Sequence, residues 1–356
     1  MQDRYGRKID YLRISITDRC NLRCRYCMPD GIEKVPMSRI LTYEQILLIA
    51  EACTRIGITK FKVTGGEPLV RKGCIGFVRR LRSLPGVQQV TMTTNGILLA
   101  ENAAALREAG LDAVNVSLDT ADPERFRQIT GGGELEKVLA GIRAAQDSGI
   151  PVKLNTVLLS GGDSEEWRDV LSLARDLSVD VRFIELMPIG FGRTLPGFSG
   201  EALLSELERE FPGMEPDTRV HGNGPARDYR IPGFPVSVGF ISAIHGTFCA
   251  SCNRIRLTSQ GLLKPCLCYG DTVDLRPLLN RAAEDCSAGS AAAGKPAAGA
   301  DAAFAESAAA SGDGAEDLLT RLSGEISRAV LEKPAQHCFG RDGGVTEERG
   351  MSQIGG

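Results

Sequence analysis

The chain has 356 residues, of which 42% are hydrophobic and 24% are charged, and its formal net charge is −3. This length suffices for one large domain or for one domain with an appendage. The nearly balanced charge argues against a general nucleic-acid-binding or membrane surface. There is no apolar run of membrane-spanning length and no signal-peptide pattern, so we expect a cytoplasmic protein whose 11 cysteines bind metal rather than form disulfides.

Strand-like and helix-like patterns alternate between about residues 10 and 190. The strand-like runs are Leu12–Ile16, Phe61–Val63, Val87–Met92, Ala113–Leu118, Val152–Leu158 and Val181–Leu186. The helix-like stretches between them are Tyr43–Ile56, Cys74–Leu84, Ala103–Ala109, Leu135–Asp147 and Glu165–Leu177. Such alternation predicts a parallel sheet with right-handed crossovers. We therefore predict an α/β fold in which residues 1–190 form an open, six-stranded partial βα barrel, with ligand loops at the carboxyl ends of the strands.

Three cysteines follow the first expected strand in the spacing C-x3-C-x2-C, at Cys20, Cys24 and Cys27. This spacing can turn three thiolates toward three corners of a four-iron cluster, which leaves one iron open for chemistry. Zinc knuckles usually present C-x2-C pairs, and ferredoxin loops carry a nearby fourth cysteine followed by proline, so both fit less well. The glycines of the later run 63–68 (VTGGEP) suit a strand end that approaches a ligand with bare backbone.

A second group of cysteines lies in the C-terminal half. Cys249 and Cys252 are followed by Cys266 after a gap of 13 residues, and then by Cys268. Four cysteines in this pattern could hold zinc, and three of them could hold a second iron–sulfur cluster. In an extended segment Cys266 and Cys268 would point to the same face, so spacing alone leaves both open as the third ligand.

Two arginines follow this cysteine pair directly, in the run 252–257 (CNRIRL). In a strand, Arg254 and Arg256 would project from the same face. Their planar guanidinium groups offer several donors at once, which suits a phosphate or the edge of a purine. The run therefore indicates an anion or nucleotide site beside the second cysteine group.

The first cysteine loop together with the VTGGEP run resembles the radical S-adenosylmethionine (SAM) superfamily. Further runs resemble one family within it, the GTP 3′,8-cyclases of molybdenum-cofactor biosynthesis. They are residues 17–21 (TDRCN), 93–96 (TTNG), 115–119 (NVSLD), 182–187 (RFIELM), 252–257 and the terminal glycine pair. The resemblance extends from about residue 10 to 281 and resumes at the C-terminus. It implies a barrel of radical SAM type followed by an auxiliary iron–sulfur cluster region at residues 191–285.

This resemblance implies an enzyme that converts GTP into (8S)-3′,8-cyclo-7,8-dihydroguanosine 5′-triphosphate, the first step of molybdenum-cofactor biosynthesis. It implies two [4Fe-4S] clusters and SAM as cofactors, with a 5′-deoxyadenosyl radical that abstracts the ribose 3′ hydrogen. The expected partners are GTP, an electron donor such as flavodoxin or ferredoxin, and cyclic pyranopterin monophosphate synthase as the next enzyme. A homodimer is one option, and neither nucleic acid nor a membrane is expected as a partner.

The resemblance also implies roles for individual residues. The SAM cluster would be held by Cys20, Cys24 and Cys27, and the auxiliary cluster by Cys249, Cys252 and Cys266. SAM would contact Tyr26, Gly66, Ser117 and Met187. GTP would contact Arg13, Lys62, Thr93, Lys153, Arg254, Ile255 and Arg256. The residues expected to serve catalysis are Arg254, Arg256, Gly355 and Gly356. Lys62 departs from the family, where an arginine is usual, and it lacks the bidentate fork.

Residues 286–316 are rich in Ala, Gly and Ser and predict a disordered insertion without a function. Residues 317–356 are expected to form a C-terminal helix and a Gly-Gly tail. Asp119 is expected to cap the segment that follows it, and His221 has no ligand spacing to another histidine. Two other functions remain as alternatives: another radical SAM enzyme with an auxiliary cluster, such as a peptide-modifying one, or a zinc-binding interaction module.

Overall fold

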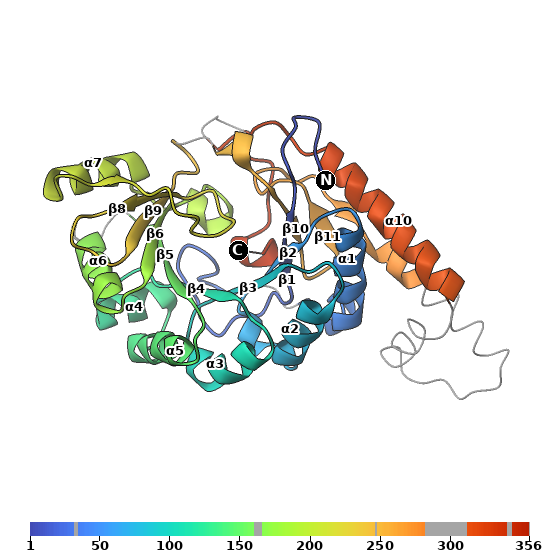
Figure 1. Ribbon diagram of the computed structural model, residues 1–356, viewed down its shortest axis with the longest axis horizontal. Helices are drawn as coiled ribbons and strands as arrows, with labels where there is room; N and C mark the ends of the chain where they lie inside the picture. Colours follow the sequence, from blue (N-terminus) through green and yellow to red (C-terminus); the bar gives the residue numbers. More distant parts are fainter. Residues whose placement is uncertain (32–34, 160–165, 246–247, 282–311, 340–343, 356) are drawn as a thin grey trace.

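The computed structural model describes residues 1–31, 35–159, 166–245, 248–281, 312–339 and 344–355. Within these ranges the strands form one sheet of twelve, in the order β12-β11-β10-β1-β2-β3-β4-β5-β6-β9-β8-β7. The sheet curves into an open arc with helices on its outer side (Figure 1). No helix in the described ranges is both long and apolar enough to cross a membrane.

Six parallel strands make up the middle of the sheet. They are β1 (Tyr11–Ser15), β2 (Lys60–Thr64), β3 (Gln89–Thr94), β4 (Ala113–Ser117), β5 (Val152–Leu158) and β6 (Asp180–Glu185). The intervening helices are α1 (Tyr43–Arg55), α2 (Cys74–Ser83), α3 (Leu99–Glu108), α4 (Pro123–Thr130), α5 (Leu135–Asp147) and α6 (Glu166–Asp176). This arrangement confirms the predicted α/β fold with a partial βα barrel.

Strands from the C-terminal region widen the barrel on both sides. The added parallel strands are β10 (Arg254–Leu257), which pairs with β1, and β9 (Ser237–Ile241), which pairs with β6. The sheet ends in antiparallel strands, namely β11 (Leu262–Lys264), β12 (Val273–Asp274), β8 (Arg227–Arg230) and β7 (Glu215–Pro216). The parallel wall is therefore broader than the predicted six strands, because β9 and β10 pair with its two outer strands.

Alternation along the strands separates the core from the barrel interior. Leu12, Phe61, Val90, Val114 and Leu154 are fully buried in the core between the sheet and the helices. Because neighbouring side chains in a strand point to opposite faces, the adjacent polar residues turn inward. The residues placed in this way include Arg13, Lys62, Thr91, Asn115 and Lys153.

The parallel pairing of β1 with β10 places the two cysteine groups at opposite ends of the barrel. The first group follows the C-terminal end of β1. Cys249 and Cys252 precede β10, whose first residue Arg254 pairs with Tyr11 at the N-terminal end of β1. Since β11 runs antiparallel to β10, Cys266 returns to that same N-terminal end.

The C-terminal part of the chain packs across the barrel. Helix α10 (Gly312–Leu331) lies against α1, where the Ser323 hydroxyl donates to the Ala52 carbonyl at 3.1 Å. Its first residues fall inside the segment predicted as an insertion, and the remainder of that segment, residues 286–311, lies outside the described residues. The tail then turns back, and the C-terminus lies inside the arc of the sheet (Figure 1).

Candidate active site

A cavity of about 350 Å³ lies inside the barrel and reaches both cysteine groups. Most of the predicted site residues line it. They are Arg13, Cys20, Cys24, Tyr26, Cys27, Lys62, Gly66, Thr93, Ser117, Lys153, Met187, Cys249, Cys252, Arg254, Arg256 and Cys266. The fold thus brings together residues that are far apart in sequence, because each lies on the inner face of a strand or in a loop at a strand end.

Two of the predicted residues are placed differently. Ile255 lies between the two inward-facing arginines of β10, so its side chain points to the other face and is fully buried in the core. The expectation of a substrate contact is therefore limited to its backbone. Gly356 lies outside the described residues, whereas Gly355 is described and contacts residues of the cavity wall.

The first cysteine loop is locked against the VTGGEP loop by backbone contacts. The Gly66 amide donates to the Thr17 carbonyl, and the Glu67 amide donates to the Arg19 carbonyl, both at 2.8 Å. A Cβ atom on Gly66 would collide with the Arg19 carbonyl, so only glycine fits this approach. The two loops therefore form one unit at the C-terminal end of β1 and β2.

The donor set of each cysteine group suits an iron–sulfur cluster. In the described ranges, no three Cys, His, Asp or Glu side chains converge closely enough to hold one ion. The thiols are nevertheless close enough to influence each other: burial and the nearby Cys20 raise the pKa of Cys27 to about 11. Cysteine thiolates are the ligands that hold four-iron clusters, and three cysteines of each group line the cavity.

The second cysteine group has a cationic environment. Lys333 is buried, and its ammonium donates to the Arg254 carbonyl at 2.9 Å. Burial acts to raise the pKa of Cys252, but Lys333 and Arg254 outweigh it and lower this pKa to about 7. A thiol of this kind loses its proton readily, and the thiolate is the form that binds metal.

Cys266 and Cys268 do not share a face, contrary to what an extended segment would give. The chain bends after β11, and Cys266 lines the cavity with Cys249 and Cys252. Cys268 is fully buried elsewhere, with its sulfur 2.7 Å from that of Cys338.

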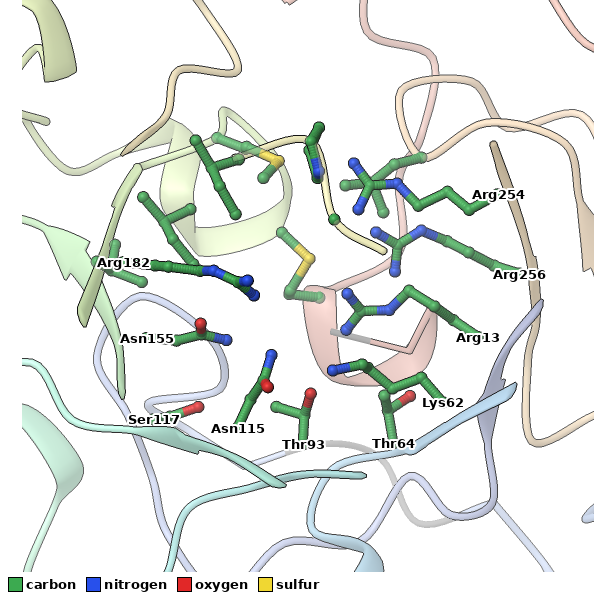
Figure 2. A pocket seen from close by; sticks show the side chains of 18 of the residues that line it. Arg13, Lys62, Thr64, Thr93, Asn115, Ser117, Asn155, Arg182, Arg254 and Arg256 are labelled. Carbon is green, nitrogen blue, oxygen red and sulfur yellow. The ribbon is translucent and has the colours of Figure 1, made fainter. Parts of the chain in front are cut away.

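Cationic side chains crowd one wall of the cavity. Arg13 pairs in register with Lys62 on one side and with Arg256 on the other, so three cations occupy neighbouring strands at one level. Figure 2 shows these side chains and Arg254 directed into the cavity. Burial, followed by the nearby cations, lowers the pKa of Lys62 well below its usual range. Like charges on paired strands are unfavourable, and an anion between them would relieve this repulsion.

Elsewhere on the cavity wall, three buried polar atoms have no partner among the described residues. The Arg182 Nε, Asn155 Oδ1 and Thr93 Oγ1 atoms are buried, and no described group bonds to them. Figure 2 shows Arg182 and Asn155 facing the cationic wall across the cavity. Buried polar atoms are normally satisfied, so these three indicate a bound polar molecule. Asn115, Asn155 and Arg182 were not assigned from sequence, although their alternation with core residues was a signal.

Tyr26 is fixed by a carboxylate. Its hydroxyl donates to Asp119 at 2.8 Å, and Asp119 also accepts from the Val157 amide at 2.8 Å. Burial raises the pKa of Asp119 to about 6. The expectation that Asp119 caps the next segment is wrong, because Asp122 caps helix α4 instead. The Asp119 carboxylate holds the Tyr26 ring beside the first cysteine group.

The C-terminal tail reaches the cationic wall. The Gly355 carbonyl accepts from the Arg256 guanidinium at 2.9 Å and from the Thr64 hydroxyl at 3.3 Å. Gly355 has a φ of +83°, and a Cβ atom there would lie 3.3 Å from the Ser15 Cβ atom. Glycine thus provides both the backbone conformation and the close approach.

A buried ion pair anchors this tail. Glu347 forms ion pairs with Lys264 and Arg349, and the side chains of Glu347 and Lys264 are 1% and 0% exposed. The Glu347 amide also donates to the Cys268 carbonyl at 3.3 Å. Burial acts to raise the pKa of Glu347, but hydrogen bonds from Arg349 and Lys264 outweigh it and lower this pKa. The tail is therefore attached close to the second cysteine group.

Comparison with known proteins agrees with this site. The chain matches the model of the radical SAM superfamily over residues 14–174 and the Molybdenum Cofactor Synthesis C model over residues 179–294. It is 41% identical to the GTP 3′,8-cyclase of Petrotoga mobilis over 360 residues, covering 100% of both chains. The GTP 3′,8-cyclase of Moorella thermoacetica is likewise 41% identical with 100% coverage of both chains. That of Peptoclostridium acidaminophilum is 48% identical over 284 residues, or 79% of this chain and 87% of the relative.

A solved structure supports the fold. Streptococcus suis SuiB bound to S-adenosylmethionine aligns with a TM-score of 0.53 at 13% identity. The alignment covers 75% of this chain and 63% of SuiB, and at this identity it shows a shared fold alone. The full-length relatives carry the assignment: the chain belongs to the GTP 3′,8-cyclase family of the radical SAM superfamily.

Proposed function

We propose that this chain converts GTP into (8S)-3′,8-cyclo-7,8-dihydroguanosine 5′-triphosphate, the first step of molybdenum-cofactor biosynthesis. The observation that carries the proposal is one cavity with a cysteine group at each end and a wall of buried cations between them. Such a cavity can hold a polyanionic nucleotide between two clusters. Membership of the GTP 3′,8-cyclase family supports the same substrate.

Cys20, Cys24 and Cys27 would hold one [4Fe-4S] cluster. Tyr26, Gly66, Ser117 and Met187 line the same end of the cavity and would bind SAM. When bound there, SAM and the cluster would supply the radical chemistry that removes the 3′ hydrogen of the ribose. The chain itself holds the Tyr26 ring through Asp119 and fixes the cysteine loop through Gly66, which keeps this end of the cavity in one arrangement.

Cys249, Cys252 and Cys266 would hold the auxiliary cluster. Cys266 is preferred to Cys268 because it shares the cavity with the other two cysteines. The low pKa of Cys252 favours the thiolate that a cluster requires.

GTP would lie between the two cysteine groups. Its negatively charged phosphates would balance the positive charges of the cationic wall. Arg13 and Arg256 would supply the bidentate donors that suit a phosphate. The remaining proposed contacts are Lys62, Thr93, Lys153, Arg254 and the Ile255 backbone. On the opposite wall, Arg182 Nε and Asn155 Oδ1 have no partner among the described residues and would bond to the substrate. Holding ribose and base rigidly is what closure of the new carbon–carbon bond needs.

The terminal glycines would complete the site. Gly355 contacts Arg256, so the tail can orient this guanidinium for the substrate. A tail that ends in two glycines brings backbone close to a radical without offering a reactive side chain. Arg254 and Arg256, with Gly355 and Gly356, are thus our proposed catalytic group.

The wider setting follows from the same reaction. We place the protein in the cytoplasm, with flavodoxin or ferredoxin as the electron donor and cyclic pyranopterin monophosphate synthase as the enzyme that takes the product; a homodimer is proposed as the assembly. Residues 1–190 would act as the radical SAM barrel and residues 191–285 as the auxiliary-cluster region. Residues 317–356 would supply the helix and tail.

Mass spectrometry tests the proposal directly. The cluster-loaded protein is incubated anaerobically with GTP, SAM and dithionite, and a matched reaction contains ATP in place of GTP. We expect the cyclised product and 5′-deoxyadenosine with GTP, and no cyclised product with ATP. Cleavage of SAM without a GTP-derived product would favour another radical SAM reaction. Zinc in place of iron and sulfide in the anaerobically isolated protein would favour the interaction module.

A further inference from the structure

One loop lines the cavity at the end of the barrel where the parallel strands begin. It comprises residues 217–226, connects β7 with β8, and lies beside β6 at the end where that strand begins. His221, Gly222, Asn223, Gly224 and Pro225 line the cavity. The loop also contacts β3, since the Asn223 amide donates to the Gln89 side chain. It therefore forms part of the wall that any molecule in the cavity would meet.

His221 is held by two carboxylates. Its Nδ1 atom lies 2.9 Å from Asp180 Oδ2, and its Nε2 atom lies 2.8 Å from Asp217 Oδ2. Asp217 is itself fixed, because it accepts from the Ser237 hydroxyl at 2.6 Å and pairs with Arg219. The imidazole side chain is 9% exposed. A ring bonded at both nitrogens and buried to this degree has one orientation.

The same histidine contacts two cations of the cavity. The Lys153 ammonium donates to Asp180 Oδ2 at 2.7 Å and lies 3.5 Å from His221 Nδ1. The Arg182 guanidinium donates to the His221 carbonyl at 2.7 Å, while its Nε atom is buried without a partner among the described residues. His221 thus shares the Asp180 carboxylate with Lys153 and holds Arg182 through its backbone.

We propose that His221 is a positioning residue that presents Lys153 and Arg182 to the triphosphate of the substrate. This inference rests on the proposed function, and it adds Lys153 and Arg182 to Arg13 and Arg256 as contacts of the phosphates. Asp180 competes with a phosphate for the Lys153 ammonium. His221 takes part of the hydrogen-bonding capacity of that carboxylate, which leaves ammonium donors free to face the cavity. The His221 carbonyl meanwhile fixes the guanidinium so that its free edge points inward.

Calorimetry with three ligands tests this role on the cluster-loaded protein. GTP, guanosine and inorganic tripolyphosphate are titrated into the wild type, His221→Ala and His221→Gln. Because hydrogen bonds to charged groups contribute about 1.5–3 kcal/mol, we expect His221→Ala to weaken GTP and tripolyphosphate binding about tenfold to a hundredfold. Guanosine binding should not change. The glutamine variant, whose amide can keep one carboxylate contact, should show an intermediate loss.

His245→Ala is the matched control, since His245 also contacts a carboxylate, Glu185, but is half exposed and lies outside the loop. It should bind all three ligands as the wild type does. In a Lys153→Met background, His221→Ala should reduce the affinity for GTP and tripolyphosphate less than it does in the wild type. The reason is that part of the effect of His221 passes through Lys153.

If His221→Ala weakened the binding of guanosine as much as the binding of GTP, His221 would have a merely structural role, and the proposal would be overturned. Unchanged GTP and tripolyphosphate binding would overturn it as well. A wild type that binds tripolyphosphate but not GTP would instead refute the proposed function, and the tripolyphosphate titrations would still decide the role of His221.

Discussion

Lys264→Met should detach the C-terminal tail from the barrel. The substitution removes the ammonium from a fully buried ion pair and leaves the Glu347 carboxylate with Arg349 as its remaining cation. Removing one partner of such a pair costs about 3–5 kcal/mol. Arg349 stays in place, so we expect the lower figure, about 3 kcal/mol, which corresponds to roughly a hundredfold increase in the population of open tail.

Hydrogen–deuterium exchange of the peptide that contains residues 345–355 measures this opening. In the folded tail the Gln353 and Ile354 amides donate to backbone carbonyls, and we expect their exchange to accelerate by about two orders of magnitude. Arg276→Met is the control, because it breaks an exposed pair with Asp274 that is worth at most about 1 kcal/mol.

Peptides from β1 to β6 should keep their wild-type exchange in Lys264→Met. A second variant, Lys264→Met with Glu347→Leu, replaces both partners of the pair and should recover most of the protection of the tail. Tail exchange equal to that of Arg276→Met would refute the reasoning, since the buried pair would then contribute no more than an exposed one.

Three further predictions concern the proposed cluster ligands and the tail. Cys24→Ala should abolish reductive SAM cleavage while the auxiliary cluster still assembles, and undiminished 5′-deoxyadenosine would contradict the assignment of this ligand. Cys266→Ala should lose the auxiliary iron and GTP turnover, whereas Cys268→Ala should keep most of both; the opposite iron contents would reverse the choice of ligand. Deletion of Gly355 and Gly356 should preserve folding, iron content and GTP binding but suppress deuterium transfer from 3′-labelled GTP into 5′-deoxyadenosine. Normal transfer would show that the two glycines are dispensable.

Much of the barrel could be predicted from sequence because its signals are local. The six central strands are short apolar runs separated by amphipathic helices, and the cysteine spacing identifies the loop after β1. Strands β9 and β10 were not predicted as parts of the parallel wall, since their pairing with β6 and β1 depends on contacts between distant segments. Local pattern carries no information about such pairings.

The candidate site shows the same limit. The inward direction of Arg13 and Arg256 follows from strand alternation, but their register beside Lys62 is a property of the assembled sheet. His221 carried no sequence signal at all, because its partners Asp180 and Lys153 lie on other elements. Asp119 was misassigned as a cap for the same reason: its partner Tyr26 is 93 positions away in the chain.

The pairing of β1 with β10 has a consequence for the folding of the chain during its synthesis on the ribosome. Asp10 and Asn253, which are hydrogen-bonded beside these strands, are 243 positions apart in the chain. During translation β1 leaves the ribosome long before its partner exists, so one edge of the nascent sheet has unpaired amides and carbonyls. Such an edge can recruit strands from other chains. A message truncated before the codon for Arg254 would thus produce a protein with a permanently open edge, and aggregation is the outcome we expect for it.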